Sequence, residues 1–435
     1  MRLNTLYINN FKSFPNATFH LEGLTLLLGA NASGKSNIRD AFRFLHGIGR
    51  GYSLSEILGG KYIDGAPVWT GIRGGSREIA FGTDNRFGLT IKLGSQEKDP
   101  RFKEDYMYRI EVEASDKPRV NAEKLYHNGI MIFDSAPAHK HLEQTDREEL
   151  QVFIPRIEHY QTEHVEVFTT YKPVVSQFTE HMKERIPIPI DRLDTNMFSS
   201  VTAVLDCLSG IRFLDLAPDS MRLPSIPGET HLGERGENLS SVLQGICKET
   251  KMKMALMGWV GQLTSMDVVD FAFLQDETGK LLLQLVERNR RKTSAYSASE
   301  GMLRFLGILV AVLGAGSGQT FFLEDIDSGL HPKRLDLLMS LPQNRIEQTG
   351  LQVIATSHTS HLVRLLTNKL QQASVAYRVE GEPGTAIMRL SDIEGIDEAL
   401  QVGDLANLHE SSWFEDALSF MASNLKQEIN TGMHP

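Results

Sequence analysis

The sequence predicts an α/β protein built around a strand, a tight loop and a helix, and three observations favour this fold class. The apolar run LTLLL (24–28) stops at a glycine-rich loop, after which a helical pattern begins near Lys35. Apolar strands are expected again far along the chain, at 320–324 and 351–356. Residues 77–135 alternate apolar and polar positions, as half-exposed antiparallel strands do. We therefore expect a mixed central sheet with flanking helices and an antiparallel β subdomain.

The first third of the chain contains two expected strands before the loop and a glycine-rich stretch after the helix. Residues 3–8 and 17–28 are strand-like and are separated by the polar turn NNFKSFPN. The helix continues through Leu45, and a stretch at 47–75 that contains GIRGGS follows it. We assign residues 1–135 to the first half of the main domain.

The middle of the chain predicts an inserted, mainly helical subdomain at 136–230. The segment from about 140 to 210 has a helical pattern that is mixed in charge and moderately amphipathic, and it shows no sustained heptads. Residues 214–230 hold three prolines and are expected to form a long surface connection. A long coiled coil is therefore not expected.

The last third predicts the second half of the main domain, at 231–397, and a helical tail at 398–435. The expected elements are a helix over ENLSSVLQGICKE, strands at 268–275 and 280–287, and a helix from about 299.

The composition excludes several classes of protein. The chain of 435 residues is 41% hydrophobic, and its formal net charge of −10 with a pI near 5.8 does not favour nucleic acid as the dominant partner. The two cysteines, Cys207 and Cys247, form no CxxC pair, which argues against a zinc site or a disulfide framework. The longest apolar stretch, 305–315, is shorter than the roughly 20 residues that cross a bilayer, and the N-terminal residues show no signal-peptide pattern. We expect a cytoplasmic protein without a membrane partner.

Residues 29–36, GANASGKS, match the phosphate-loop pattern G-x-x-x-x-G-K-[ST] between an apolar strand and a helix. Its two glycines let the backbone turn tightly, so that successive N–H groups face phosphate oxygens. Lys35 would reach the β and γ phosphates, and the Ser36 hydroxyl would bind Mg²⁺. A chance glycine-rich turn is the alternative, which the flanking elements disfavour. The predicted nucleotide-binding residues are Gly29, Ala30, Asn31, Ala32, Ser33, Gly34, Lys35, Ser36 and Asn37.

Three further stretches follow in a fixed order toward the C-terminus. SASEGMLRFLGIL (297–309) is a small polar loop that runs into a helix, and FFLEDIDSGLHP (321–332) is an apolar strand that ends in acids. LQVIATSHTSHLV (351–363) is a strand that ends in polar residues and His358. Together with INNFKSF near the N-terminus and the phosphate loop, this order resembles the ABC-type ATPase heads of the SMC, RecF and OLD families.

The resemblance covers roughly residues 1–90 and 230–395, and it implies a site for ATP and Mg²⁺ that two copies of the chain share. In such a site Glu324 holds Mg²⁺, and Asp325 polarises the attacking water. His358 matches the histidine that senses the γ-phosphate. The residues that a second copy would bring to the nucleotide or to the dimer seam are Ser299, Glu300, Gly301 and Asp327.

Two of these residues also have plainer interpretations, and the chain departs from the family in two ways. Ser299 would cap a helix in any protein, and His358 could simply end a strand at the edge of a core. The family has glutamate and proline where this chain has Asp325 and Ile326, and the shorter aspartate predicts slow turnover. The stretch GIRGGSREI (71–79) occupies the region expected for a Q-loop but contains no glutamine.

What the chain lacks narrows the branch of this superfamily. The middle segment has no long coiled coil of SMC type. A protein of RecF type would be expected to have a more basic surface than this chain, whose net charge is −10. YRVEGEPG (377–384) echoes the acidic strand of a TOPRIM nuclease, as found in OLD proteins, but no D-x-D follows. The best remaining resemblance is to stand-alone OLD-like, AAA family ATPases of bacterial anti-phage defence modules. It implies a head-to-head dimer or higher homo-oligomer that acts as an ATP-dependent switch or scaffold for a separately encoded effector, a nuclease or toxin.

The alternative function is a RecF- or SMC-like ATPase that binds DNA in repair or recombination. The candidate nucleic-acid contacts are Arg288, Arg290, Arg291 and Lys292, within ERNRRK. The same segment could instead be a solvated hairpin tip. DNA-stimulated ATP hydrolysis that is lost on charge reversal of the arginines would favour DNA binding, whereas hydrolysis indifferent to DNA would favour the switch.

Overall fold

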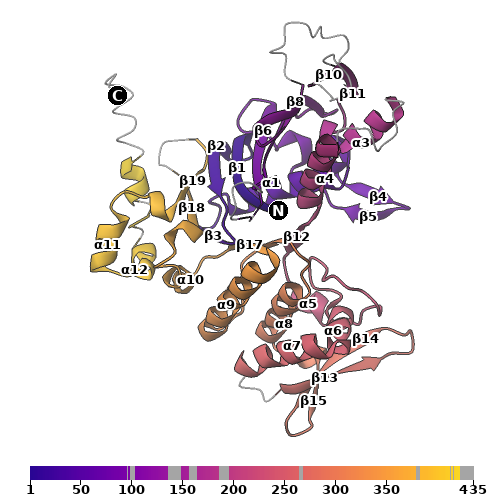
Figure 1. Cartoon of the computed structure of the whole chain (residues 1–435). Helices are drawn as coiled ribbons and strands as arrows, with labels where there is room; N and C mark the ends of the chain where they lie inside the picture. Colours follow the sequence, from indigo (N-terminus) through magenta and orange to yellow (C-terminus); the bar gives the residue numbers. More distant parts are fainter. Residues whose placement is uncertain are drawn as a thin grey trace.

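The computed structural model describes residues 1–95, 97, 103–135, 148–155, 164–185, 195–263, 268–378, 383–411, 413–414 and 416–421. It contains a central sheet of mostly parallel strands, an antiparallel sheet on one side of it, and a helical lobe with a small sheet on the other (Figure 1). This arrangement confirms the predicted fold class. The boundaries of the four predicted segments remain a prediction.

The central sheet positions the acids and the phosphate loop. Its strand order is β12 (Ile211–Leu214), β16 (Thr320–Leu323), β17 (Gln352–Thr356), β3 (Leu24–Leu28), β18 (Ala373–Tyr377) and β19 (Ala386–Arg389). All neighbours are parallel except β18 and β19. β3, β16 and β17 are buried along their whole length, which explains their continuous apolar runs. Because these strands are parallel, their carboxyl ends meet at one edge of the sheet.

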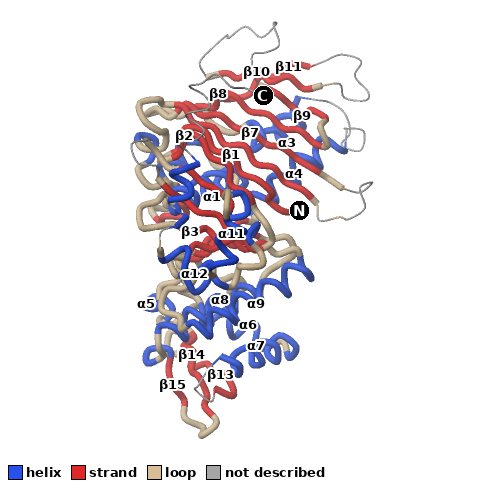
Figure 2. Tube along the Cα trace, turned by 90° about the vertical axis from the view of Figure 1, so that its left-hand side faces the viewer, coloured by secondary structure: helices blue, strands red, loops and turns tan. Residues whose placement is uncertain are grey.

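The antiparallel sheet contains eight strands. They are, from edge to edge, β11 (His164–Thr169), β10 (Glu149–Ile154), β9 (Ile130–Asp134), β8 (Arg119–His127), β7 (Asp105–Glu113), β6 (Arg86–Gly94), β1 (Arg2–Phe11) and β2 (Phe14–His20). Figure 2 shows them side by side across the upper part of the molecule. Buried and exposed residues alternate along β6 and β7, as the sequence predicts. Their buried side chains share one core with α1 (Lys35–Gly49), α3 (Val174–Arg185) and α4 (Thr195–Ser209).

Two elements differ from the prediction made for the N-terminal half. Residues 17–28 form two separate strands, because the chain leaves β2 after His20 and enters β3 at Leu24. The helical prediction for about 140–210 is wrong over Glu149–Ile154 and His164–Thr169, which pair with each other as β10 and β11. These segments are too short to show a clear period, and pairing with the edge of the sheet decides their conformation. Helices occupy the described residues of this segment only from Val174 onward.

The helical lobe packs against the central sheet and shares a second core with it. Its helices are α5 (Pro218–Met221), α6 (Leu239–Lys248), α7 (Thr250–Leu263), α8 (Glu300–Leu313) and α9 (Pro332–Thr349), and its sheet contains β13 (Val268–Gln275), β14 (Leu281–Glu287) and β15 (Lys292–Ser294). The elements predicted in this part of the sequence are therefore confirmed. α8 is buried along nearly its whole length, which accounts for the apolar stretch in its sequence. No helix in the described ranges is both long and apolar enough to cross a bilayer.

The remaining elements are short. They are α2 (Leu54–Gly59), the hairpin of β4 (Lys61–Ile63) and β5 (Ala66–Trp69), α10 (Ser360–Arg364), α11 (Ile396–Val402), α12 (Leu405–Glu410), and 3₁₀ turns at Gly75–Arg77, Ala295–Ser297, Leu370–Gln372 and Leu390–Asp392. The predicted helical character of the C-terminal segment is confirmed for its described residues. Residues 379–382, inside the segment YRVEGEPG, lie outside the description.

Candidate functional site

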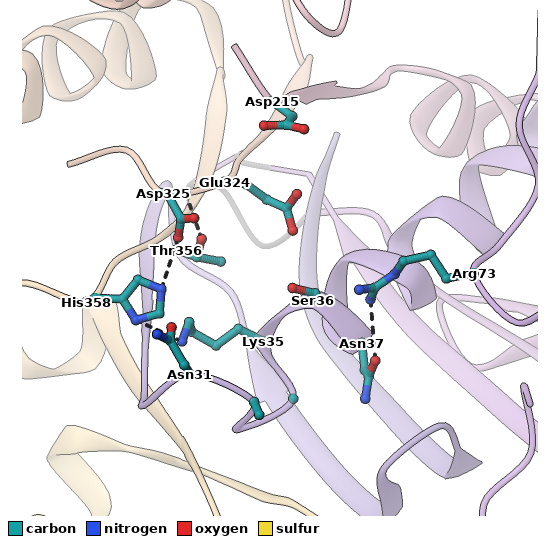
Figure 3. A pocket seen from close by; sticks show the side chains of 12 residues that line it. Asn31, Lys35, Ser36, Asn37, Arg73, Asp215, Glu324, Asp325, Thr356 and His358 are labelled. Carbon is teal, nitrogen blue, oxygen red and sulfur yellow. Dashed lines mark hydrogen bonds and ion pairs between the residues drawn. The ribbon is translucent and has the colours of Figure 1, made fainter. Parts of the chain in front are cut away.

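A cavity of about 470 Å³ opens where the carboxyl ends of the central strands meet the start of α1. Figure 3 shows the acids Asp215, Glu324 and Asp325 on one side of this cavity, with Lys35 and Ser36 facing them. The lining residues are Asn31, Ala32, Gly34, Lys35, Ser36, Asn37, Arg73, Asp215, Glu324, Asp325, Thr356 and His358. A cleft beyond the carboxyl ends of parallel strands is the usual position of ligands in open α/β sheets.

The phosphate loop has the backbone that its glycines predict. Gly29 and Gly34 have φ values of 143° and 97°, where residues with a side chain are strained. A Cβ atom on Gly29 would also lie 2.5 Å from the carbonyl oxygen of Ala376 on the neighbouring strand. α1 begins at Lys35, so its first N–H groups and the positive end of its dipole adjoin the cavity. This geometry suits an anionic ligand.

Lys35 is buried, and its ammonium group is held beside the loop. Its Nζ donates to the carbonyl oxygens of Gly29 and Ala30 at 2.6 and 2.9 Å and lies 3.3 Å from Nδ1 of His358. Burial lowers the pKa of this ammonium, and the carboxylates of Asp325 and Asp327 oppose that shift. The hydrogen-bond partners of this cation are therefore two backbone carbonyl groups and an imidazole ring of the protein.

The side chains of Asp325 and His358 are in contact, and this contact continues the line from Lys35 across the strand ends. Nε2 of His358 lies 3.2 Å from Oδ1 of Asp325, and the backbone N–H of Asp325 donates to Oγ1 of Thr356 at 2.9 Å. The φ of Asp325 is 44°, in the left-handed region where aspartate and asparagine are several-fold enriched over other side chains. The aspartate at this position therefore fits its backbone better than the glutamate of the resembling families would.

Glu324 and Asp215 are neighbours at the ends of two adjacent strands. Leu323 of β16 pairs in parallel register with Leu214 of β12, so the two acids follow at the same level of the sheet. Burial raises the pKa of the Glu324 carboxyl, and the guanidinium of Arg39, 3.2 Å away, opposes the shift. The sequence analysis did not identify Asp215. The segment IRFLD that contains it does repeat the apolar-then-acid pattern of FFLED, and this was the available signal.

Arg73 is a second cavity residue that the sequence analysis did not assign. It belongs to the GIRGGS segment, where no glutamine is present. Its Nη2 donates to Oδ2 of Asp40 at 2.8 Å and lies 3.4 Å from Oδ1 of Asn37. Both partners are on α1, so the guanidinium lies beside the helix N-terminus in the cavity wall.

Asp327 lies behind the cavity and stabilises the segment that carries His358. Its Oδ2 accepts hydrogen bonds from Oγ of Ser357 at 2.9 Å and from the backbone N–H of His358 at 3.3 Å. It is not among the residues that line the cavity. Within one chain, Asp327 therefore positions the backbone of the histidine.

The structure does not bring Ser299, Glu300 or Gly301 to this cavity. Ser299 is the N-cap of α8, and its Oγ accepts a hydrogen bond from the N–H of Met302 at 3.3 Å. A Cβ atom on Gly301 would overlap the carbonyl oxygen of Gly329. Within one chain, Ser299 therefore acts as a helix cap, as its plainer interpretation predicts. Ser299 could contact only a nucleotide that is bound to another copy of the chain.

The cations of ERNRRK also lie away from the cavity, at the turn between β14 and β15 in the lower lobe (Figure 1). Arg290 has a positive φ of 67°, as is common in tight turns. The residues Arg288, Arg290, Arg291 and Lys292 are exposed. They lie at the tip of the hairpin that β14 and β15 form.

Comparison with known proteins gives one family match. The family described as "AAA domain, putative AbiEii toxin, Type IV TA system" matches residues 24–364. This range includes the phosphate loop, the three acids of the cavity and His358. No curated protein matches the chain.

Similar solved structures include SMC head domains. The SMC head bound to the C-winged helix domain of ScpA is 11% identical, covers 90% of this chain and 99% of its own, and has a TM-score of 0.48. The SMC head domain from Thermotoga maritima is 13% identical over 89% and 99%, with a TM-score of 0.41. An SMC head with an extended coiled coil, bound to the C-terminal domain of ScpA derived from Pyrococcus furiosus, is 11% identical over 92% and 99%, with a TM-score of 0.43.

Proposed function

Because the chain belongs to this AAA-domain family, we propose that it is an ABC-type ATPase that binds ATP with Mg²⁺ and hydrolyses it slowly in a site completed by a second copy. The observation that carries the proposal is the line formed by Lys35, His358 and Asp325 beside the phosphate loop. A cation from the start of α1, a histidine that follows β17 and a carboxylate that follows β16 meet where the terminal phosphate of a nucleotide would lie.

The phosphates would occupy the N-terminal end of α1. The N–H groups of the loop and the helix dipole would bind their oxygens, and Lys35 would exchange its carbonyl partners for the β and γ phosphates. Arg73, beside the same helix end, adds a guanidinium suited to bidentate phosphate contact. These positive groups would neutralise charge that develops during phosphoryl transfer.

A divalent cation fits three oxygen-bearing side chains that line the cavity, those of Ser36, Asp215 and Glu324. In the described part of the chain, no cluster of three or more His, Cys, Asp or Glu side chains is arranged to hold a metal by itself. The Ser36 hydroxyl and the carboxylates of Glu324 and Asp215 are, however, hard oxygen ligands on one cavity, and Mg²⁺ is commonly held by few protein oxygens plus substrate phosphates. We propose that these three groups hold Mg²⁺, which supplies electrostatic stabilisation of the phosphates when bound.

Asp325 would accept a hydrogen bond from the attacking water, and His358 would contact the γ-phosphate. The present bond between His358 and Asp325 keeps the carboxylate near the position that the water needs. A positioned carboxylate base of this kind contributes typically about 10²–10⁴-fold to a rate. Its short side chain supports the expectation of slow turnover.

The second copy would contribute the N-terminus of α8 to the nucleotide. Ser299 supports two interpretations, because capping its own helix and binding a γ-phosphate in trans use the same hydroxyl. Ser299→Asp separates them, since aspartate caps a helix as well as serine does but adds a charge that repels phosphate. If Ser299 acts only as a cap, ATP hydrolysis will be unchanged; if it acts in trans, hydrolysis and ATP-dependent dimerisation will both be lost.

The shared site can be tested by mixing two inactive variants. Lys35→Met removes the phosphate contact of one copy, and Ser299→Asp removes the contribution of its partner. A mixed dimer contains one site with an intact phosphate loop and an intact Ser299, so mixing should restore part of the ATPase activity. Lys124→Met, in the antiparallel sheet, is the control lysine variant, because Lys124 pairs with Asp134 far from the cavity. Absence of ATP binding by the unmodified chain, or equal binding by Lys35→Met, would refute the proposal.

For the biological role we propose a switch or scaffold that controls a partner effector in anti-phage defence. The family description, which refers to a toxin of a toxin–antitoxin system, supports this class of role. The exposed cations between β14 and β15 support the alternative, a DNA-binding ATPase of repair or recombination. Two experiments distinguish these roles. The first is purification of the chain, expressed from its native operon, in the presence of ATP, followed by mass measurement of whatever co-purifies. The second is an assay of ATP hydrolysis with and without DNA. A co-purifying effector supports the switch, and DNA-stimulated hydrolysis that charge reversal of Arg290 and Arg291 removes supports the alternative.

A further inference from the structure

Arg39 is a half-buried cation that lies between two carboxylates, one of which lines the cavity. Its side chain is 15% exposed, and its Nη1 lies 3.2 Å from Oε2 of Glu324. Its Nη2 also donates to Oε1 of Glu234, which belongs to the loop before α6. Arg39 is one turn after Ser36 on α1, so both side chains lie on the same face of the helix. The guanidinium therefore adjoins the proposed metal position.

Glu324 cannot give the same oxygens to a guanidinium and to a divalent cation at close range. Two cations at one carboxylate repel each other, and inside a cavity water screens that repulsion only weakly. Arg39 contacts only Oε2 of Glu324, but its charge opposes the approach of a divalent cation to the same carboxylate, so binding of Mg²⁺ favours withdrawal of Arg39. The structure supplies a second acceptor for it, because Glu234 is already in contact with Arg39.

Glu234 is held in place independently of Arg39. Its carboxylate accepts from Nη1 of Arg43 at 2.9 and 3.2 Å, and its backbone oxygen accepts the N–H of Asp215 at 2.9 Å. Arg43 in turn bonds Thr70 and stacks on Trp69. Glu234 is therefore a fixed carboxylate that can retain Arg39 when Glu324 is taken by another cation.

We propose that Arg39 is a positioning residue that occupies Glu324 in the metal-free site and transfers fully to Glu234 when Mg²⁺ arrives with the nucleotide. The inference rests on the proposed function, because it assumes that Glu324 holds the metal. Arg39 and Mg²⁺ then compete for Glu324, and Arg39 sets the metal concentration at which the site fills.

Competition predicts that two neighbouring substitutions act in opposite directions. Arg39→Met removes the competitor, so the Mg²⁺ concentration for half-maximal tightening of nucleotide binding should fall. Glu234→Gln removes the negative charge of the second acceptor, so Glu324 becomes the stronger partner of Arg39 and that concentration should rise. For a partly buried pair shared by two carboxylates we expect a change of roughly three- to tenfold in each direction. Arg39→Lys retains the charge and should stay near the wild-type value.

The probe is a fluorescent ADP analogue titrated with Mg²⁺ on the full-length chain at pH 8, with binding in EDTA as the baseline. The double variant Arg39→Met/Glu234→Gln should match Arg39→Met, because Glu234 acts only through Arg39. Lys124→Met, which removes an ion pair elsewhere, should leave the Mg²⁺ dependence unchanged. Thermal unfolding of each variant checks that the fold is retained.

Three outcomes are decisive. Shifts in the same direction for Arg39→Met and Glu234→Gln, or no shift in either, overturn the competition, because a merely structural network would weaken the site whichever residue is removed. Opposite shifts for the two single variants, together with a double variant that matches Arg39→Met, support the competition. If the unmodified chain binds the analogue in EDTA but does not respond to Mg²⁺, or does not bind it at all, the proposed function fails rather than the role of Arg39.

Discussion

Replacement of Asp325 by asparagine should stop ATP hydrolysis while preserving nucleotide binding. Asparagine has the same size, and it shares the tolerance of aspartate for the left-handed backbone at φ 44°. Its Oδ1 can keep the contact with Nε2 of His358, and the backbone bond to Thr356 does not involve the side chain. The substitution therefore removes only the negative charge and the ability to take a proton from water.

The magnitude follows from these two losses. Removing a general base costs typically about 10²–10⁴-fold in rate, and the lower limit corresponds to about 2.7 kcal/mol in the activation barrier. Removing a carboxylate close to the proposed γ-phosphate position relieves about 1 kcal/mol of repulsion if the effective dielectric is between those of protein and water. We therefore expect hydrolysis to fall at least about 100-fold and ATP affinity to stay the same or rise by up to about fivefold.

The assay is single-turnover hydrolysis of labelled ATP, with equilibrium binding measured on the same preparations. Asp336→Asn is the matched control, because Asp336 also accepts from a histidine, with 2.7 Å between Nε2 of His361 and Oδ1 of Asp336, and it is not among the residues that line the cavity. The reasoning is refuted if Asp325→Asn hydrolyses ATP within about threefold of the wild-type rate, or if binding and hydrolysis are lost together.

Three further predictions concern the same site and the fold around it. Asp325→Glu should raise steady-state turnover, because the longer carboxylate reaches the attacking water better. It should also lower the free energy of unfolding by about 0.5–1 kcal/mol, because glutamate fits the left-handed backbone less well than aspartate does. Slower turnover in phosphate-release assays would contradict this prediction. Gly301→Ala should lower the free energy of unfolding by about 1–3 kcal/mol in urea titrations, because the added methyl overlaps the carbonyl oxygen of Gly329, and an unchanged midpoint would exclude that close approach. Burial raises the pKa of Glu123 from 4.5 to about 7, so the folded state holds this proton more tightly than the unfolded chain. The free energy of unfolding should therefore fall by up to about 3 kcal/mol as the pH rises from about 4.5 to 7, and in Glu123→Gln, which is less stable at every pH, this part of the slope should disappear.

The parts of the fold that the sequence predicted well are those decided by local pattern. The phosphate loop, the buried strands on either side of it and the apolar helix α8 each carry their own signal in consecutive residues. The strands β10 and β11 do not, because six-residue segments of mixed character adopt whichever conformation the neighbouring sheet edge offers.

The residues of the candidate site also fall into two groups, those that lie in recognisable sequence motifs and those that long-range contacts bring to the cavity. Lys35, Glu324 and His358 lie within recognisable stretches, and the structure brings all three to one cavity. Asp215 and Arg73 are harder to place from sequence, because each reaches the cavity through long-range contacts, although the pattern of IRFLD is a local signal for Asp215. Parallel pairing of β12 with β16 places Asp215, and ion pairing with Asp40 on α1 places Arg73. The roles of these residues remain predictions for the experiments above.

The left-handed backbone at Asp325 also limits how this site can evolve. Aspartate and asparagine are the two non-glycine side chains best suited to that conformation, and their codons differ by a single base. If the chain hydrolyses ATP as proposed, one point mutation in the gene would keep the loop intact and convert the proposed ATPase into a protein that holds its nucleotide. On the proposed function, homologues that have lost hydrolysis but still bind nucleotide should therefore carry asparagine at the position of Asp325 more often than any other replacement.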